Sequence, residues 1–170
     1  SIRKEGNTPA WGAVYEQYFQ EIDKVKGQKG VLSVEKKLFV ETNNGTNRQI
    51  RPVTPEQPLR IGDKVIVRLT IRTDREMNYV FLKDLRAGCF EPADQLSSPE
   101  SRDGIWYYRS PKDVSENFFI NRLPEGTFVL EYPVYVSRSG EYAGGISTIQ
   151  CMYAPEFVSH TAGESLRIMP

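Results

Sequence analysis

In Lys64-Val-Ile-Val-Arg-Leu-Thr-Ile-Arg72, apolar side chains recur at every second position. A period of two is typical of a β-strand with one buried face and one solvated face. The apolar set is Val65, Val67, Leu69 and Ile71, and the opposite set is Lys64, Arg68, Thr70 and Arg72. This stretch therefore predicts a strand at the edge of a hydrophobic core.

A second long alternation, from Phe128 to Val136, predicts another core strand. Pro133 lies on its other face, which indicates an edge position or a bulge because proline cannot donate to a strand ladder. The turn Thr73-Asp-Arg-Glu-Met77 predicts that residues 79–82 return antiparallel. Further strands are expected at residues 32–40, 104–108, 116–121, 146–151 and 165–169.

Seven or so short strands, separated by Gly, Pro, Asn and Asp turns, predict an all-β fold, an antiparallel β-sandwich. Each alternating face must be buried to offset the entropy lost on ordering. We expect the core to include Val65, Val67, Leu69, Ile71, Phe128, Leu130, Val134 and Val136.

The N-terminal segment has a different pattern. Trp11, Ala13 and Tyr15 alternate, whereas the apolar residues from Tyr18 to Val25 drift toward helical spacing. This predicts a strand that ends near Tyr18, followed by an irregular or one-turn helical stretch. Residues 24–30 form a polar, glycine-containing linker.

The composition is ordinary for a folded domain, with 39% hydrophobic and 26% charged residues in 170. Lys and Arg (22) balance Asp and Glu (22), and no long basic run occurs, so nucleic acid is not an expected partner. No apolar stretch approaches the length of a membrane-spanning helix. The length fits one β-rich domain with an appended segment, and we expect the chain to be part of a longer protein.

No catalytic, cofactor or metal constellation is visible. The single histidine, His160, lies in a polar Ser-His-Thr-Ala-Gly stretch, where a solvated loop side chain is expected. Cys89 and Cys151 are either one disulfide or two buried thiols, with the thiols favoured. Glu125, Glu131 and Glu141 are expected on solvent faces, and Asn44-Gly-Thr46 is either a glycosylation sequon or a tight turn. The chain is therefore not expected to be an enzyme.

Five segments form a recognisable series along the chain: Leu59-Arg-Ile-Gly-Asp-Lys-Val-Ile-Val67, Val80-Phe-Leu-Lys-Asp-Leu-Arg-Ala-Gly-Cys-Phe-Glu-Pro92, Phe118-Phe-Ile-Asn-Arg-Leu-Pro-Glu-Gly-Thr-Phe-Val-Leu-Glu-Tyr132, Gly140-Glu-Tyr-Ala143 and Gln150-Cys-Met-Tyr-Ala-Pro-Glu-Phe157. In this order they resemble the C-terminal domain of bacterial alpha-2-macroglobulins, which are large cell-envelope proteins that trap proteases. In the last segment, Pro155 is expected to stop the strand. The resemblance extends over about 130 residues, from near Val40 to the end of the chain, and implies a fibronectin-like or macroglobulin-like β-sandwich with an extra N-terminal segment.

The resemblance also implies a domain layout and a role. Residues 1–27 would be the trailing strand of a neighbouring CUB-like domain plus linker, and residues 28–170 the C-terminal macroglobulin-like sandwich. In the family this domain packs on the domain that carries a reactive thioester, and a Met-Tyr pair covers that bond. The matching pair here is Met152 and Tyr153. The family's thioester motif (Cys-x-Glu-Gln) is absent from this chain, and in the family it lies in the preceding domain.

The function implied is that of a non-catalytic latch in a broad-spectrum protease inhibitor of bacterial defence. Its partners would be other domains of the same parent chain, with proteases as the targets of the parent. The parent would lie in the cell envelope or periplasm, or outside the cell, and could carry a lipid anchor. The alternative is a secreted binding or adhesion module that uses the aromatic run Trp106, Tyr107 and Tyr108 for a carbohydrate or a protein.

Overall fold

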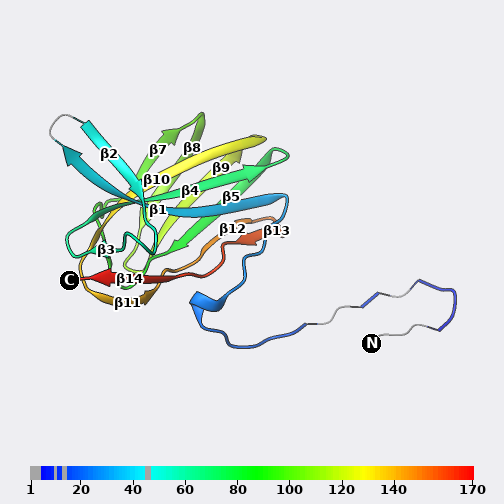
Figure 1. Cartoon of the computed structure of the whole chain (residues 1–170). Coiled ribbons are helices and arrows are strands. Elements are labelled where there is room, and N and C mark those ends of the chain that lie inside the picture. Colours follow the sequence, from blue (N-terminus) through cyan, green and yellow to red (C-terminus); the bar gives the residue numbers. More distant parts are fainter. Residues whose placement is uncertain (1–4, 10, 13–14, 45–46) are drawn as a thin grey trace.

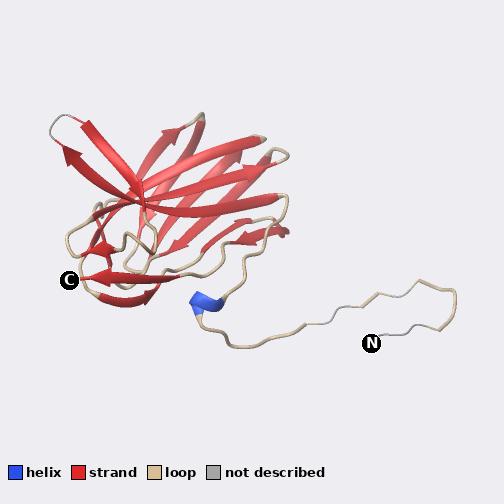
Figure 2. Cartoon of the chain, in the orientation of Figure 1, coloured by secondary structure: helices blue, strands red, loops and turns tan. Residues whose placement is uncertain are grey.

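The structure, a computed structural model, describes residues 5–9, 11–12, 15–44 and 47–170. Strands β1 to β14 dominate this part of the chain, and its helical structure is one 3-10 turn, η1 (Ile22–Lys24) (Figure 2). Figure 1 shows two sheets stacked as a sandwich, with the N-terminal segment extended away from it. The predicted all-β, antiparallel sandwich is confirmed.

One layer is a five-stranded antiparallel sheet with the order β2-β1-β4-β10-β6. Its members are β1 (Leu32–Asn44), β2 (Asn47–Pro52), β4 (Lys64–Thr73), β6 (Phe90–Pro92) and β10 (Gly126–Val136). β4 is central, because Val67 lies between Leu38 on β1 and Tyr132 on β10. The stretch that alternates most regularly in the sequence is therefore the middle of this sheet.

The facing layer is a six-stranded antiparallel sheet with the order β13-β12-β5-β9-β8-β7. Its members are β5 (Met77–Leu85), β7 (Ser98–Arg102), β8 (Ile105–Pro111), β9 (Ser115–Leu123), β12 (Ser147–Cys151) and β13 (Ala154–His160). A smaller sheet of β3 (Leu59–Arg60), β11 (Gly140–Ala143) and β14 (Ser165–Met169) closes one end, with β14 parallel to β3 (Figure 1).

The core lies between the two large sheets. Every residue predicted for it is buried, with exposed fractions from 0% at Val65 to 8% at Phe128. Tyr132, Phe118, Leu82 and Ile149 fill the same space and were not on the predicted list. The period-two pattern therefore identified the core face of the five-stranded sheet, because that sheet contains the long alternating strands.

The strand after β4 pairs differently from the prediction. Residues 79–82 do form part of β5, but β5 does not pair with β4; the chain crosses to the facing sheet, where β5 lies between β9 and β12. Pro133 fits the expected edge position, because β6 pairs with β10 only from Val134 onward. Hydrophobic patterning alone does not distinguish a hairpin from a crossing between layers, since both bury one face.

The N-terminal segment forms no strand among its described residues up to Glu21, and the predicted strand near Tyr18 includes residues that lie outside the description. The expected one-turn helix is η1. From Asp23 onward the segment is tied to the sandwich: Gly163 donates its N–H to Val25 O at 2.8 Å, and Gln28 pairs with His160. Of the Asn44-Gly-Thr46 sequence, Asn44 is the last residue of β1, and residues 45 and 46 lie outside the described part of the chain.

Candidate functional site: an exposed aromatic turn

The Met152–Tyr153 turn joins β12 to β13 at the edge of the six-stranded sheet (Figure 1). The register between these strands shifts next to the turn, so that Cys151 pairs with Ala154 while Gln150 pairs with Val158. Pro155 therefore does not stop the strand as expected; the chain reverses before it, and it lies within β13. An edge strand at an irregularity tolerates a proline because no ladder N–H is needed there.

Met152 and Tyr153 both project into solvent, with exposed fractions of 54% and 79%. Their backbone is fixed nonetheless, because Met152 donates its N–H to Tyr79 O at 2.9 Å. The Cys151 thiol lies 3.1 Å from Asn78 O. The Tyr153 ring meets the Tyr79 ring edge-on, with centroids 5.2 Å apart and planes at 84°. The pair is thus an exposed aromatic and thioether on a well-anchored support.

More aromatic side chains follow on the outer face of the same sheet. Phe81 and Phe119 stack at 4.9 Å, and Phe119 lies opposite Tyr108 across the β8–β9 pair. Trp106 is 72% exposed and, with Tyr108, lines a groove of about 400 Å³. This face carries exposed aromatic surface well beyond the Met152–Tyr153 turn.

Tyr107 does not belong to that face, contrary to the aromatic run expected from the sequence. Alternation along β8 turns it inward, where it is buried and donates a hydrogen bond to Glu100 at 3.0 Å. Burial, reinforced by the Glu100 carboxylate, raises the pKa of Tyr107 to about 12. The surface pair is therefore Trp106 and Tyr108.

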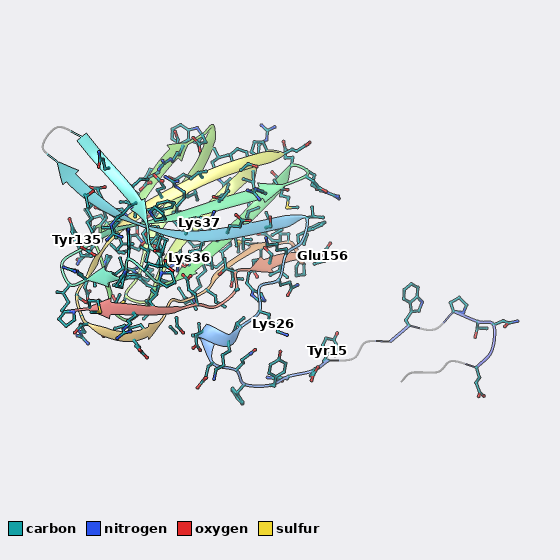
Figure 3. The ribbon with its side chains drawn as sticks, viewed as in Figure 1. Tyr15, Lys26, Lys36, Lys37, Tyr135 and Glu156 are labelled. Carbon is teal, nitrogen blue, oxygen red and sulfur yellow. The ribbon has the colours of Figure 1, made fainter. Side chains whose placement is uncertain are left out.

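A buried polar cluster between the sheets was not predicted. The Asp84 carboxylate, fully buried, accepts hydrogen bonds from Ser147 Oγ and Lys36 Nζ, each at 2.8 Å, and from the Tyr132 hydroxyl. Lys36, on β1 in the body of the sandwich (Figure 3), also donates to Leu85 O at 2.9 Å. Burial, together with the Asp84 charge, raises the pKa of Tyr132 well above its ordinary value.

The cluster continues to Glu116, the partner of Asp84 across the β5–β9 pair. Glu116 accepts a hydrogen bond from Arg109 Nε at 2.7 Å, and Arg86 lies 3.6 Å from its other oxygen. Burial raises the pKa of Glu116, and the two guanidinium groups oppose that shift. Lys36 and Tyr132 belong to the five-stranded sheet and Asp84 to the six-stranded one, so the Asp84 contacts tie the two layers together. Glu116 and Arg109 lie on neighbouring strands of one sheet, and Glu116 Oε2 and Arg109 Nη2 are buried without a hydrogen-bond partner.

Other candidate residues take unremarkable positions. His160 is a half-buried residue at the end of β13 rather than a solvated loop side chain, since its backbone pairs with Gln28. Cys89 and Cys151 are free buried thiols, and burial raises the pKa of Cys89 to about 11. Glu125 and Glu141 are exposed, but Glu131 is half-buried between Arg68 and Arg102 at 2.6 and 2.8 Å.

Among the described residues, no group of three or more His, Cys, Asp or Glu side chains is arranged to hold a metal ion. No helix in this part of the chain is long and apolar enough to cross a membrane.

Comparison with protein families gives a match over residues 32–156 to the model described as "Bacterial Alpha-2-macroglobulin MG10 domain". The matched region extends from the start of β1 to Glu156, just beyond the Met152–Tyr153 turn. The 31 residues before it and the last strand, β14, lie outside the match.

Solved structures with the same fold include alpha-2-macroglobulins of Salmonella and Escherichia coli. Salmonella alpha-2-macroglobulin reacted with methylamine matches 85% of this chain with a TM-score of 0.65 and 21% identity, and 10% of that chain is covered. Native Escherichia coli alpha-2-macroglobulin, spanning MG7 to the C-terminus, matches with a TM-score of 0.65 and 17% identity, over 85% of this chain and 24% of that one.

A curated protein also matches: "Circularly permutated Ras protein 2" of Dictyostelium discoideum is 28% identical over 109 residues. The alignment covers 64% of this chain and 3% of the Dictyostelium protein. The chain thus spans 3%, 10% and 24% of these three relatives.

Proposed function

Because this chain belongs to the bacterial alpha-2-macroglobulin MG10 domain family, we propose that it is a non-catalytic latch within a protease-trapping protein. Its partner is the preceding domain of the same parent chain, and proteases are the targets of the parent. The parent is proposed to act in the cell envelope, the periplasm or outside the cell. Residues 1–27 are the trailing strand and linker of a neighbouring CUB-like domain in this proposal.

Within that proposal, Met152 and Tyr153 shield a reactive thioester on the neighbouring domain. The observation that carries this role is the exposure of Tyr153, 79%, on a turn that is anchored to β5 by the hydrogen bond from Met152 N–H to Tyr79 O. An apolar ring held out from a rigid edge can cover a bond on a second surface and exclude water from it. Met152 supports the same role, because a flexible thioether fills irregular gaps around an aromatic ring.

The test uses the full-length parent with Tyr153→Ala. We expect the variant to lose its thioester faster than the parent without any protease, as measured by the release of a free thiol over time. Tyr135→Ala is the matched control, because Tyr135 is an exposed tyrosine on β10 of the other sheet, far from Glu156 in Figure 3. Equal rates of thiol release in the two variants would rule out the shielding role.

A second candidate function is a binding module, favoured by one observation. The groove of about 400 Å³ beside Trp106 and Tyr108 offers exposed aromatic faces of the kind that stack on sugar rings or apolar peptides. Titration with soluble oligosaccharides, followed by isothermal titration calorimetry, tests it. Saturable binding heat that is lost in Trp106→Ala but kept in Trp11→Ala would support this module.

A further inference from the structure

Tyr79, the third residue of β5, has an unusual backbone conformation for a strand. Its φ is 56°, in the left-handed region, where a side chain with a Cβ is strained. Among the described residues, Asp103 is the other non-glycine residue with positive φ, and it lies in the tight turn between β7 and β8 beside Gly104. Tyr79 lies inside β5, where no chain reversal requires such a conformation.

The conformation changes the phase of the strand. Val80 and Leu82 are buried, so strict alternation would bury Asn78, yet Asn78 is exposed and Met77 is buried. The β5–β9 register includes the pairs formed by Asn78 and Val80 and omits Tyr79 between them. Tyr79 is therefore where β5 departs from regular pairing, and its side chain is 53% exposed.

The backbone and the side chain of Tyr79 both contact the Met152–Tyr153 turn. Its carbonyl oxygen accepts the N–H of Met152 at 2.9 Å, and its ring meets the Tyr153 ring edge-on at 5.2 Å. The edge-to-face arrangement is a favoured geometry for aromatic pairs. Strain of this kind persists where the surroundings impose it, and it is often found at functional sites.

We propose that Tyr79 is a positioning residue for Tyr153, holding the exposed ring in the orientation that covers its partner surface. The proposal rests on the proposed function, in which Tyr153 does the shielding. An exposed tyrosine without a neighbour exchanges between χ1 rotamers, and each exchange would open the covered bond to water. The Tyr79 ring limits that exchange before the neighbouring domain docks. Less conformational entropy of the Tyr153 side chain is therefore lost when the two surfaces meet.

The test separates the ring of Tyr79 from its strained backbone. Tyr79→Gly removes the ring, and glycine adopts positive φ without a steric cost, so the strand conformation is kept. Tyr79→Asn removes the aromatic ring with a residue that tolerates the same region, in case the glycine variant loosens β5. Tyr79→Phe keeps the ring and serves as the rescue, and Tyr135→Ala again removes a distant exposed tyrosine.

The first measurement is made on this chain alone. NMR scalar couplings of Tyr153 report whether its χ1 angle averages over several rotamers. We expect averaging over several rotamers in the glycine and asparagine variants, and one dominant rotamer in Tyr79→Phe and Tyr135→Ala. A purely structural role would change the melting temperature without changing these couplings. Unchanged couplings in both ring-deleting variants would overturn the positioning role.

The second measurement is made on the full-length parent. It is the rate at which a free thiol is released when no protease is present. We expect Tyr79→Gly to speed the release by roughly two- to ten-fold, the range that corresponds to one aromatic pair. If Tyr153→Ala speeds release and Tyr79→Gly does not, the positioning inference fails alone. If Tyr153→Ala has no effect, the shielding function itself fails, and the couplings still decide whether Tyr79 orients Tyr153.

Discussion

The buried Asp84 carboxylate has polar contacts to three other side chains. It binds Lys36 from the facing sheet, Ser147 from β12 and Tyr132 from β10. All four side chains are 5% exposed or less. In a dry site, an ion pair of this kind adds little net stability, but removing one partner leaves the other charge uncompensated.

Asp84→Ala is therefore expected to be costly. The change leaves the Lys36 ammonium without its counter-ion, and the free energy of unfolding should fall by about 3–5 kcal/mol. Urea denaturation of the chain measures it. Asp113→Ala, at an exposed position between β8 and β9, is the control and should stay within about 0.5 kcal/mol of the parent. A loss below about 1 kcal/mol for Asp84→Ala would contradict the buried ion pair.

A double variant distinguishes the effect of the unpaired charge from the effect of lost side-chain volume. Lys36→Met with Asp84→Leu removes both charges together, and should recover most of the stability lost in Asp84→Ala. Recovery is measured from the same urea curves. If the double variant were as unstable as Asp84→Ala, the hydroxyls of Tyr132 and Ser147 would carry the effect instead.

Phe118 and Tyr153 are aromatic residues of the same sheet that differ in burial, so their truncation should differ in its cost to stability. Phe118 is 1% exposed and packs between Tyr107 and Tyr132, so Phe118→Ala should cost about 3–5 kcal/mol of stability. Tyr153→Ala should cost only about 0.5–1.5 kcal/mol, the contribution of its edge-on contact with Tyr79. Thermal or urea unfolding of this chain compares them. Similar losses for both variants would mean that Tyr153 packs as a core residue.

These residues also mark the limit of what the sequence could predict at this scale. Met152 and Tyr153 were identified because a motif in the chain resembles a family. Lys36 and Asp84 were missed, because 48 residues separate them and a charged side chain in a strand normally faces solvent. The left-handed Tyr79 was also missed, since tyrosine carries no signal for positive φ.

At the scale of single elements, β10 carries an ion-pair group on its solvent side. Glu131 lies 2.6 Å from Arg68 on β4 and 2.8 Å from Arg102 on β7. Partial burial acts to raise the pKa of Glu131, but the two arginines outweigh it and hold the pKa below its usual value. β10 is thereby joined both to its sheet neighbour and to the facing layer.

The sign of the pH dependence follows from that lowered pKa. The folded state holds the Glu131 proton less tightly than the unfolded chain, whose pKa is about 4.5. The resulting stability is therefore complete above this pH and is lost as the pH falls through the folded-state pKa. Glu131→Gln should flatten the decline of stability between about pH 5 and the folded-state pKa, whereas Glu125→Gln, at an exposed position, should not. Parallel curves for the parent and Glu131→Gln would contradict this.

The connection between β11 and β12 depends on Gly145. Its φ is 74°, and a Cβ there would lie 2.2 Å from Leu85 O, next to the backbone that binds Lys36. Gly104 also has positive φ, 83°, but has open space around it. Gly104→Ala should cost about 1–2 kcal/mol from backbone strain alone, and Gly145→Ala clearly more, because the strand end must also move. Equal melting temperatures for the two variants would contradict the steric role.

Element boundaries followed from the sequence wherever a strand alternates over several positions. β4, β10 and β14 lie where alternation or turn signals predicted them. β3 and β6, with two and three residues, are too short to show a period. The pairing of β5 with β9 and β12 was not predictable from pattern, since a buried face has the same sequence signature in either layer.

At the scale of the whole molecule, the N-terminal segment carries aromatic residues that do not pack on the sandwich. Trp11, Tyr15 and Phe19 are 97%, 93% and 106% exposed, and Figure 3 shows Tyr15 on a stretch that extends clear of both sheets. Ser165 donates a hydrogen bond to Asp23, and Gly163 donates one to Val25 O, so this part of the segment is tied to the sandwich. Large aromatic residues spaced along a segment without a core are surface that a neighbouring domain, or a second copy, would cover.

Replacing Trp11, Tyr15 and Phe19 together by serine should therefore leave the fold unchanged. The free energy of unfolding should stay within about 0.5 kcal/mol of the parent, because these rings contribute nothing to the core. Self-association of the chain at raised concentration should decrease, as measured by sedimentation velocity, because the apolar surface is gone. Glu5→Ser with Glu16→Ser, in the same segment, is the control and should not reduce association. A large loss of stability in the triple variant would mean that the segment packs on the sandwich in solution, and the boundary near residue 27 would then be wrong.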